Sequence, residues 1–327
     1  MIDPFGRSIS YVRISVTDRC NLRCTYCMPD GYLGAESPAD VLSYEEIAKI
    51  AEAMVGLGVQ KFRLTGGEPL VRRELHVLVR QLAAFPEVTD LALSTNAVLL
   101  RQNARALKDA GLRRVNISLD TLRPETFKAI SVNASLDAVL DGIAAAEEVG
   151  LAPIKINTVV MKGVNDMEVE DLARLTFTKP WTMRFIEVMP MRQNPGKQVG
   201  QYVSTDDIQT RLERVGRLIP VERDAHAGPA KEFRYEGAVG SVGFITPLSH
   251  TFCGSCNRVR MTTTGKLRLC LFGESGCDLR TPLRAGASVD DLRGIILAAL
   301  KHKPESHHLA LGYSGPEAPI TMSTIGG

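Results

Sequence analysis

Cys20-Asn21-Leu22-Arg23-Cys24-Thr25-Tyr26-Cys27 is the most informative stretch of this chain. It carries three cysteines at a Cys-x3-Cys-x2-Cys spacing, with an aromatic side chain directly before the last thiol. Three thiolates on one short loop can bind three irons of a 4Fe-4S cube, in which a fourth cysteine is the usual remaining ligand. No fourth cysteine lies nearby in the sequence, so the spacing predicts an open iron and a catalytic cluster.

Two other interpretations of this loop are weaker. Zinc sites usually pair one Cys-x2-Cys with a second such pair, and this spacing does not match that pattern. Disulfides are disfavoured because the thiols are crowded and residues 1–7 contain no apolar segment typical of a signal peptide. We therefore expect a reducing, cytoplasmic environment.

The composition is typical of a globular protein with a sizeable core. Of the 327 residues 44% are hydrophobic, and 39 Lys and Arg nearly balance 37 Asp and Glu. No run of eighteen apolar residues occurs, so we expect no membrane span. A protein that wraps nucleic acid usually has a clear basic excess. The near balance therefore argues against nucleic acid but leaves room for a local basic pocket.

Strands and helices alternate through the first two-thirds of the sequence. We expect strands at residues 11–16, 61–64, 91–94, 115–118, 154–160 and 183–188, and helices at residues 43–57, 74–84, 102–110, 136–149 and 168–176. This alternation predicts a parallel sheet covered by helices. Six units are fewer than the eight of a closed barrel. The fold class is therefore α/β, a partial (β/α)6 TIM-like barrel with its active groups at the carboxyl ends of the strands.

The pattern changes near residue 220. A linker-like segment at residues 224–230 precedes short predicted strands, including residues 239–245 and a hairpin that turns at Thr264-Gly265. We therefore predict two parts. Residues 1–220 form the partial barrel, and residues 221–327 form a C-terminal α+β extension that carries a second thiol site.

The second thiol site consists of Cys253, Cys256 and Cys270. Zinc is a serious alternative here, because His250 or Cys277 could complete a tetrahedral site. The presence of the first cysteine loop favours a second iron–sulfur cluster instead. Arg258 and Arg260 follow directly on one strand face, where they could hold phosphates beside the metal centre.

Candidate ligand-binding residues also occur within and after the barrel strands. The two glycines of Thr65-Gly66-Gly67-Glu68-Pro69 would let a ligand approach the backbone, and Glu68 could accept a hydrogen bond from an ammonium group. An ordinary turn is the alternative there, and helix capping is the alternative for the polar segments 94–96 and 116–120. Inward-facing Arg13, Arg63 and Lys155 would form a pocket for a phosphate-rich molecule, although ion pairs at the sheet edges remain open.

The cysteine loop with Tyr26 resembles the signature of the radical S-adenosylmethionine (SAM) superfamily. The segments Cys253-x2-Cys256-Asn257-Arg258-Val259-Arg260 and Gly265-Lys266-Leu267-x2-Cys270-Leu271-Phe272 are similar to those of the GTP 3′,8-cyclases, which begin molybdenum cofactor biosynthesis. Further matching segments, including the terminal Gly326-Gly327, extend the resemblance over nearly the whole chain.

The resemblance implies a radical reaction on GTP. Two 4Fe-4S clusters and SAM would be the cofactors, with an external electron donor. SAM would yield methionine and a 5′-deoxyadenosyl radical, which removes hydrogen from C3′ of GTP. Closure of C3′ on guanine C8 would give (8S)-3′,8-cyclo-7,8-dihydroguanosine 5′-triphosphate. In such enzymes the cofactor performs the difficult chemistry and the protein positions it.

The resemblance also implies roles for particular residues. Cluster ligands would be Cys20, Cys24 and Cys27 at the first site and Cys253, Cys256 and Cys270 at the second. SAM would contact Tyr26, Gly67, Glu68, Ser118 and Met189. GTP would contact Arg13, Arg63, Ser94, Lys155, Arg258, Val259 and Arg260. Catalysis would depend on Arg258, Arg260, Gly326 and Gly327. We further expect a homodimer and contact with the next pathway enzyme, cyclic pyranopterin monophosphate synthase.

Two residues depart from the family pattern. Ala97 stands where the family has glycine, which puts the geometry of its loop in question. Cys277 lies outside the cluster pattern and is expected to be a free thiol. Two other functions remain open. A peptide-modifying radical SAM enzyme would usually have more C-terminal cysteines and lack the two arginines and the Gly-Gly end. A zinc-bound nucleic-acid-binding protein is disfavoured by the charge balance.

Overall fold

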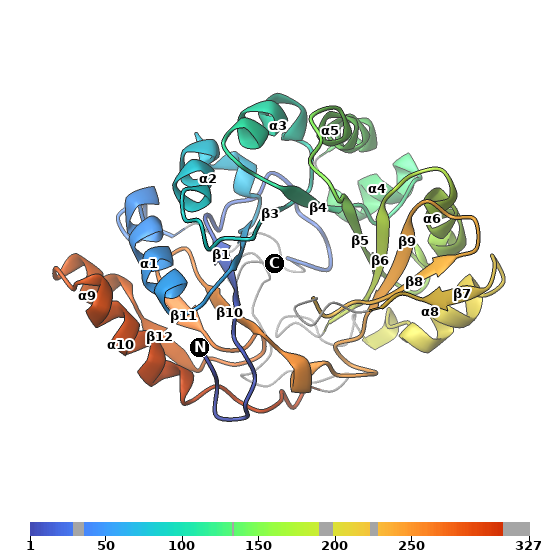
Figure 1. The fold of residues 1–327 in the computed structure, drawn as a ribbon. Helices are drawn as coiled ribbons and strands as arrows, with labels where there is room; N and C mark the ends of the chain where they lie inside the picture. The colour runs from blue at the N-terminus through green and yellow to red at the C-terminus, as the bar shows by residue number, and fades with distance from the viewer. Residues whose placement is uncertain (29–35, 133, 190–198, 223–227, 310–327) are drawn as a thin grey trace.

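A computed structural model describes residues 1–28, 36–132, 134–189, 199–222 and 228–309. Six parallel strands form the wall of an open barrel in chain order (Figure 1). They are β1 (Tyr11–Ser15), β2 (Lys61–Thr65), β3 (Asp90–Thr95), β4 (Arg114–Ser118), β5 (Lys155–Val160) and β6 (Thr182–Glu187). The predicted partial (β/α)6 barrel is confirmed.

Helices cover the outside of this wall. The predicted ones are α1 (Tyr44–Gly56), α2 (Leu75–Ala83), α3 (Leu100–Asp109), α5 (Leu136–Glu148) and α6 (Val169–Arg174). The expected capping box opens α1, since Ser43 Oγ accepts from Glu46 N and Glu46 Oε2 accepts from Ser43 N. The predicted fifth helix is shorter than expected, because its last turn is a 3₁₀ turn.

The C-terminal part extends the same sheet at both edges. On one side β10 (Arg258–Met261) pairs in parallel with β1 and is followed by β11 (Lys266–Arg268) and β12 (Gly276–Asp278). On the other, β9 (Ser241–Ile245) pairs in parallel with β6 and continues to β8 (Lys231–Tyr235) and β7 (Leu218–Pro220). The added strands therefore cover the edges that a six-stranded wall would expose.

The sheet has twelve strands and runs without a break past the predicted boundary near residue 220, which stays a prediction. The expected hairpin is present, since β10 and β11 are antiparallel on either side of Thr264-Gly265. Within the described ranges, four helices were not predicted: α4 (Pro124–Ser131), α8 (Thr205–Leu212), α9 (Arg280–Arg284) and α10 (Val289–Leu300).

The alternation of side chains along the strands separates the core from the lumen. On β1, Val12 and Ile14 are buried in the hydrophobic core under the helices, while Arg13 lines the lumen. On β2, Phe62 and Leu64 face the core, and the alternate residues Lys61, Arg63 and Thr65 face the lumen. Successive strand side chains point to opposite faces. Most polar positions of the strands are therefore directed into the barrel, where they surround a cavity, whereas Thr158 of β5 is buried on the other face.

No single helix among the described residues is long and apolar enough to cross a membrane. The bent pair α4 and α5 would pass such a test together, by length and composition only.

Candidate functional site

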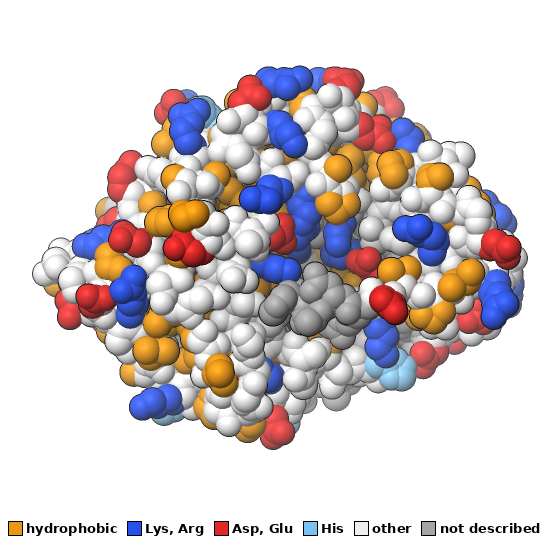
Figure 2. All heavy atoms as spheres, viewed as in Figure 1, with side chains coloured by type: hydrophobic (Ala, Val, Ile, Leu, Met, Phe, Trp, Pro, Cys, Tyr) orange, Lys and Arg blue, Asp and Glu red, His pale blue; other side chains and the backbone are white. Residues whose placement is uncertain are grey.

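The lumen of the barrel contains a cavity of about 750 Å³, a size typical of cofactor and substrate pockets. Lysine and arginine side chains gather where the surface is hollowed near the centre of the molecule (Figure 2). The basic residues that line the cavity are Arg13, Lys61, Arg63, Arg114, Lys155, Arg184, Lys231, Arg258 and Arg260.

The two thiol sites lie at opposite ends of the barrel strands; Cys20, Cys24 and Cys27 line the cavity, whereas Cys253, Cys256 and Cys270 do not. Cys20 follows the carboxyl end of β1, and Cys256 precedes the amino end of β10. Because β1 and β10 are parallel neighbours, Cys20 lies at the carboxyl ends of the strands and Cys256 at their amino ends. Cys270 follows β11, which is antiparallel to β10, so it returns to the same edge as Cys256. A ligand in the lumen would therefore lie between the two sites.

The first cysteine loop is a tight turn that lines the cavity. Backbone N–H groups of Cys27 and Met28 both donate to Cys24 O, at 3.0 and 2.9 Å. Thr25 N donates to Ile130 O at 3.0 Å, which fixes the loop against the end of α4. Burial raises the pKa of the Cys20 and Cys24 thiols, and each neighbouring thiol raises that of Cys24 further. Three crowded thiols would thus gain from metal binding, which favours the thiolate.

Among the described residues, no three His, Cys, Asp or Glu side chains converge on a single point where one metal ion would bind. A 4Fe-4S cube makes a different demand, because its cysteines each bind a separate iron. At each site three cysteine thiols lie close enough to influence the pKa of one another, and this set of donors fits such a cluster.

The glycine loop after β2 is bound directly to the segment that leads into the cysteine loop. Gly67 N donates to Thr17 O at 2.7 Å, and Glu68 N donates to Arg19 O at 2.8 Å. A Cβ atom at Gly67 would lie 2.3 Å from Arg19 O. The glycine is therefore required by this close backbone approach, whatever ligand it also contacts.

Glu68 is buried and holds the loop after β3. Its Oε1 accepts from Thr95 Oγ1 at 2.7 Å and from Leu70 N at 3.1 Å, and its Oε2 accepts from Asn96 N at 2.7 Å. Burial raises its pKa to about 7, although these hydrogen bonds oppose the shift. The expected bond from an ammonium group would have to add to these partners.

Ala97 adopts the left-handed conformation that the family's glycine suggested, with φ of 64° and no exposed surface. A Cβ atom at Gly142 of α5 would lie 2.2 Å from Ala97 O, so the loop packs closely on that helix. Beside it, Asn96 Nδ2 donates to Asn21 Oδ1 of the cysteine loop at 2.8 Å. The loop is thus retained despite the substitution.

Other predicted SAM contacts lie at the same end of the cavity. Tyr26, Ser118 and Met189 all line it. Tyr26 OH donates to Asp120 Oδ2 at 2.9 Å, and Asp120 Oδ1 accepts from Val159 N at 2.9 Å. No individual ligand role was predicted for Asp120 from the sequence, and the structure places it in the cavity lining as a partner of Tyr26.

Three arginines lie side by side across adjacent strands. Arg13 of β1 is in register with Arg63 of β2 on one side and with Arg260 of β10 on the other. Neighbouring strands are about 4.8 Å apart, so the three guanidinium groups point into one small region. Burial lowers the pKa of all three, and neighbouring arginines add to this effect at each of them. Nε of Arg63 makes no hydrogen bond with any described residue.

Lys155 faces inward as expected, and Asn157 and Val159 of the same strand, β5, also line the cavity. Ser94 lines it too. Val259 does not: its side chain is buried in the core, since strand alternation turns it away from Arg258 and Arg260. Any contact between Val259 and a ligand would therefore have to involve its backbone.

Four further basic residues of the cavity were missed by sequence reasoning: Lys61, Arg114, Arg184 and Lys231. Arg114 forms a bidentate pair with Asp90, at 2.8 and 2.6 Å, and Arg184 pairs with Glu232 at 2.8 Å. Polar alternation with Asn116 and the position of Arg184 in a predicted strand were signals that could have identified these two.

The second thiol site is held by two buried cations. Lys303 Nζ donates to Arg258 O at 3.0 Å and also to Leu269 O, the residue before Cys270. Arg7 Nη1 donates to Cys253 O at 2.9 Å. Against the effect of burial, Arg258 and Lys303 lower the pKa of the Cys256 thiol. The three predicted ligands are therefore fixed by side chains distant in sequence.

The residues proposed to complete a zinc site are engaged elsewhere. His250 Nε2 lies 3.0 Å from Asp206 Oδ1 in an exposed pair. Cys277 is on β12 opposite Leu267, and burial raises its pKa to about 11. The predicted contacts of Gly326 and Gly327 lie outside the described residues.

Comparisons with known proteins agree with this geometry. Residues 14–176 match the model of the radical SAM superfamily, and residues 181–309 match that of Molybdenum Cofactor Synthesis C. The chain is 46% identical to a GTP 3′,8-cyclase of Moorella thermoacetica over all of both chains. It is 47% identical to one of Geobacter sulfurreducens, covering 100% of this chain and 99% of the relative.

Solved structures show the same fold at low identity. SuiB of Streptococcus suis bound to S-adenosylmethionine matches with a TM-score of 0.62 and 13% identity, covering 88% of this chain and 68% of that one. Native anSMEcpe with bound AdoMet matches with a TM-score of 0.59 and 15% identity, covering 91% and 81%.

Proposed function

The chain belongs to the GTP 3′,8-cyclases of the radical SAM superfamily, and we propose that it cyclises GTP in the first step of molybdenum cofactor biosynthesis. Membership of the superfamily brings SAM and an iron–sulfur cluster as cofactors. The observation that carries the proposal is a basic cavity that Cys20, Cys24 and Cys27 line, with Phe252 and Leu271, the neighbours of Cys253 and Cys270, also lining it.

At one end, Cys20, Cys24 and Cys27 would hold the cluster that binds SAM. When bound, the cluster and SAM together supply a 5′-deoxyadenosyl radical that can remove a hydrogen atom from a substrate. The residues proposed to surround SAM are Tyr26, Gly67, Glu68, Ser118 and Met189. Their loops are bonded to one another, so they would orient SAM on a rigid frame.

In the middle of the lumen, Arg13, Arg63 and Arg260 would bind the triphosphate together with Lys155. Three neighbouring guanidinium groups repel one another strongly in a buried site, and a polyphosphate would convert that repulsion into paired, charge-assisted hydrogen bonds. Guanidinium geometry matches phosphate oxygens two at a time. Ser94, Arg258 and Val259 are the further proposed GTP contacts.

At the other end, we propose that Cys253, Cys256 and Cys270 hold a second 4Fe-4S cluster beside the guanine. The five residues of β1 span about 17 Å, at 3.3 Å per residue, from the amino end of the strand to its carboxyl end. A nucleoside triphosphate can lie within that span. Arg258, Arg260, Gly326 and Gly327 are the proposed catalytic group.

Anaerobic iron and sulfide analysis tests the second cluster. The wild type is compared with the triple variant Cys253→Ala, Cys256→Ala and Cys270→Ala, and with Cys277→Ala as the matched control. Two cubes require roughly twice as much iron in the wild type as in the triple variant, and full iron in the control. If the triple variant keeps its iron and loses zinc instead, the second site is structural and the proposed binding of guanine there fails.

The remaining features are proposals that rest on the family. They are the external electron donor, the homodimer, contact with cyclic pyranopterin monophosphate synthase and a cytoplasmic location. The division into residues 1–220 and 221–327 is also a proposal, and the two family models meet earlier, between residues 176 and 181.

A further inference from the structure

A carboxylate lies among the cations of the cavity. Glu232 Oε1 is 2.8 Å from Arg184 Nη2 and 3.5 Å from Lys155 Nζ. One carboxylate oxygen is therefore shared by two basic side chains, and its single negative charge offsets part of their combined positive charge. Lys155 is also a proposed contact of the triphosphate, so the carboxylate and a phosphate group would compete for the same ammonium group.

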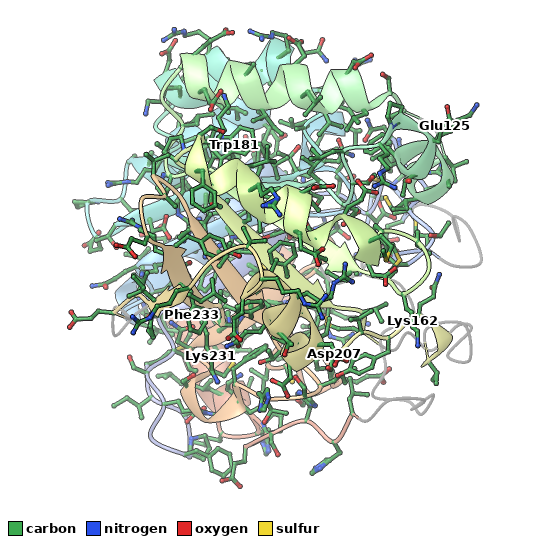
Figure 3. All side chains as sticks on the ribbon, turned by 90° about the vertical axis from the view of Figure 1, so that its right-hand side faces the viewer. Glu125, Lys162, Trp181, Asp207, Lys231 and Phe233 are labelled. Atoms are coloured by element: carbon green, nitrogen blue, oxygen red, sulfur yellow. The ribbon has the colours of Figure 1, made fainter. Side chains whose placement is uncertain are left out.

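The register of the strands brings Glu232 to this position. Glu232 of β8 is opposite Gly243 of β9, and Gly243 is opposite Arg184 of β6. A Cβ atom at Gly243 would touch both side chains, at 3.4 Å from Glu232 Cγ and 3.5 Å from Arg184 Cγ. Glu232 thus reaches Arg184 across the bare backbone of Gly243. Its neighbours on β8, Lys231 and Phe233, are labelled in Figure 3.

The three partners differ in how freely they can move. The side chain of Glu232 is 28% exposed, whereas those of Arg184 and Lys155 are 6% and 19% exposed. Against the effect of burial, Lys155 and Arg184 lower the pKa of Glu232, which is ionised at neutral pH. The carboxylate can therefore turn toward solvent, while the two cations stay in the cavity.

We propose that Glu232 is an internal counter-ion that a polyphosphate displaces from Arg184 and Lys155. Without ligand, removal of a carboxylate would leave two buried cations unpaired, which is strongly unfavourable. When a polyphosphate binds, a phosphate group takes the place of the carboxylate beside the two cations. The negative charge of the ligand then repels the Glu232 side chain, which moves away from it. Glu232 therefore stabilises the free protein, opposes anion binding and favours ligands with enough charge to replace it. The identity of that ligand as GTP rests on the proposed function.

Binding measurements on the anaerobic holoenzyme test this inference. The variant is Glu232→Gln, and the matched control is Glu222→Gln, because Glu222 lines the cavity but forms no ion pair with the described residues. The probes are GTP, inorganic triphosphate and guanosine. We expect Glu232→Gln to bind both anions roughly tenfold more tightly, the scale of one close charge pair, and guanosine as the wild type does. Its thermal midpoint without ligand should fall, and the control should change neither.

Unchanged or weaker triphosphate binding by Glu232→Gln would overturn the inference, because the carboxylate would then position the cations for the ligand. If that variant does not fold, Glu232→Asp keeps the charge with a shorter reach and should still bind anions more tightly. Binding of inorganic triphosphate without binding of GTP would reject the proposed function and leave the counter-ion intact. Binding of neither anion by the wild type would reject both.

Discussion

Lys155 shows how one side chain links burial to ligand binding. Burial and the nearby Arg184 lower the pKa of its ammonium group to about 8, although Glu232 opposes the shift. A triphosphate binds the protonated form. We therefore expect the affinity for GTP to fall as the pH rises above about 8, because the free protein then loses the lysine proton. Titration calorimetry between pH 7 and pH 9.5 measures this directly.

The control for this prediction is Lys155→Arg, which keeps its charge throughout the range and should show little fall. A wild-type profile as flat as that of the variant would contradict it. The stability of the ligand-free protein should change in the opposite direction. Because the folded pKa lies below the unfolded value of 10.5, the unfolded state binds more protons between about pH 8 and 10.5, and stability rises with pH there.

Gly142 offers a test of the loop that carries Ala97. In Gly142→Ala the new methyl group would meet Ala97 O, a backbone atom that cannot move without shifting the loop. We expect a loss of about 2–3 kcal/mol in the free energy of unfolding, measured with denaturant. The matched control is Gly294→Ala in the middle of α10, where a Cβ atom would meet nothing and should stabilise the protein by about 0.5–1 kcal/mol. Equal effects at the two sites would contradict this account.

At the scale of residues, sequence reasoning identified side chains whose chemistry is unusual for their position. Arg13, Arg63 and Lys155 were recognised because a cation in a barrel strand needs an anionic partner. Arg114 was missed because it is the first residue of its strand and precedes the apolar segment that predicted it. Arg184 was missed because it lies within a strand that was predicted from its apolar residues. Val259 was carried over from the family although alternation with Arg258 already placed it on the other face.

At the scale of elements, the second thiol site depends on contacts between distant segments. Lys303, just after α10, is buried and holds the backbone on both sides of the cysteine hairpin. In Lys303→Met two carbonyl groups lose their donor and the thiol site loses a buried cation. We expect anaerobically reconstituted protein to contain roughly half the wild-type iron, because one of two cubes is lost.

Lys301→Met is the control for this variant, since Lys301 is exposed and lies two residues away. It should keep all of its iron. Lys303→Arg retains the charge and should bind more iron than Lys303→Met. Full iron in Lys303→Met would show that the cysteine loops hold their geometry without the lysine.

The barrel strands were predictable because each carries its own local pattern and alternates with a helix. The pairing of β9 with β6 and of β10 with β1 was not, because it joins segments far apart in the sequence. No turn residue or periodicity encodes such long-range parallel pairing. The C-terminal part was therefore expected as a separate extension, whereas its strands complete both edges of the barrel sheet.

At the scale of the whole molecule, those edge strands determine the geometry of the site. The parallel pairing of β10 with β1 puts the second thiol site at the amino edge of the sheet and the first at the carboxyl edge. The cations between them come from strands of both parts. Sequence motifs predicted the two thiol sites, but not that they lie at opposite ends of the same barrel strands.

We propose that GTP lies in this lumen with its C3′ hydrogen within reach of the SAM end. Anaerobic turnover of the reduced holoenzyme with GTP deuterated at C3′ tests it most directly, by mass spectrometry of the 5′-deoxyadenosine formed. We expect deuterium in 5′-deoxyadenosine and a cyclised product formed in equal amount. Unlabelled 5′-deoxyadenosine, formed at the same rate with or without GTP, would contradict it.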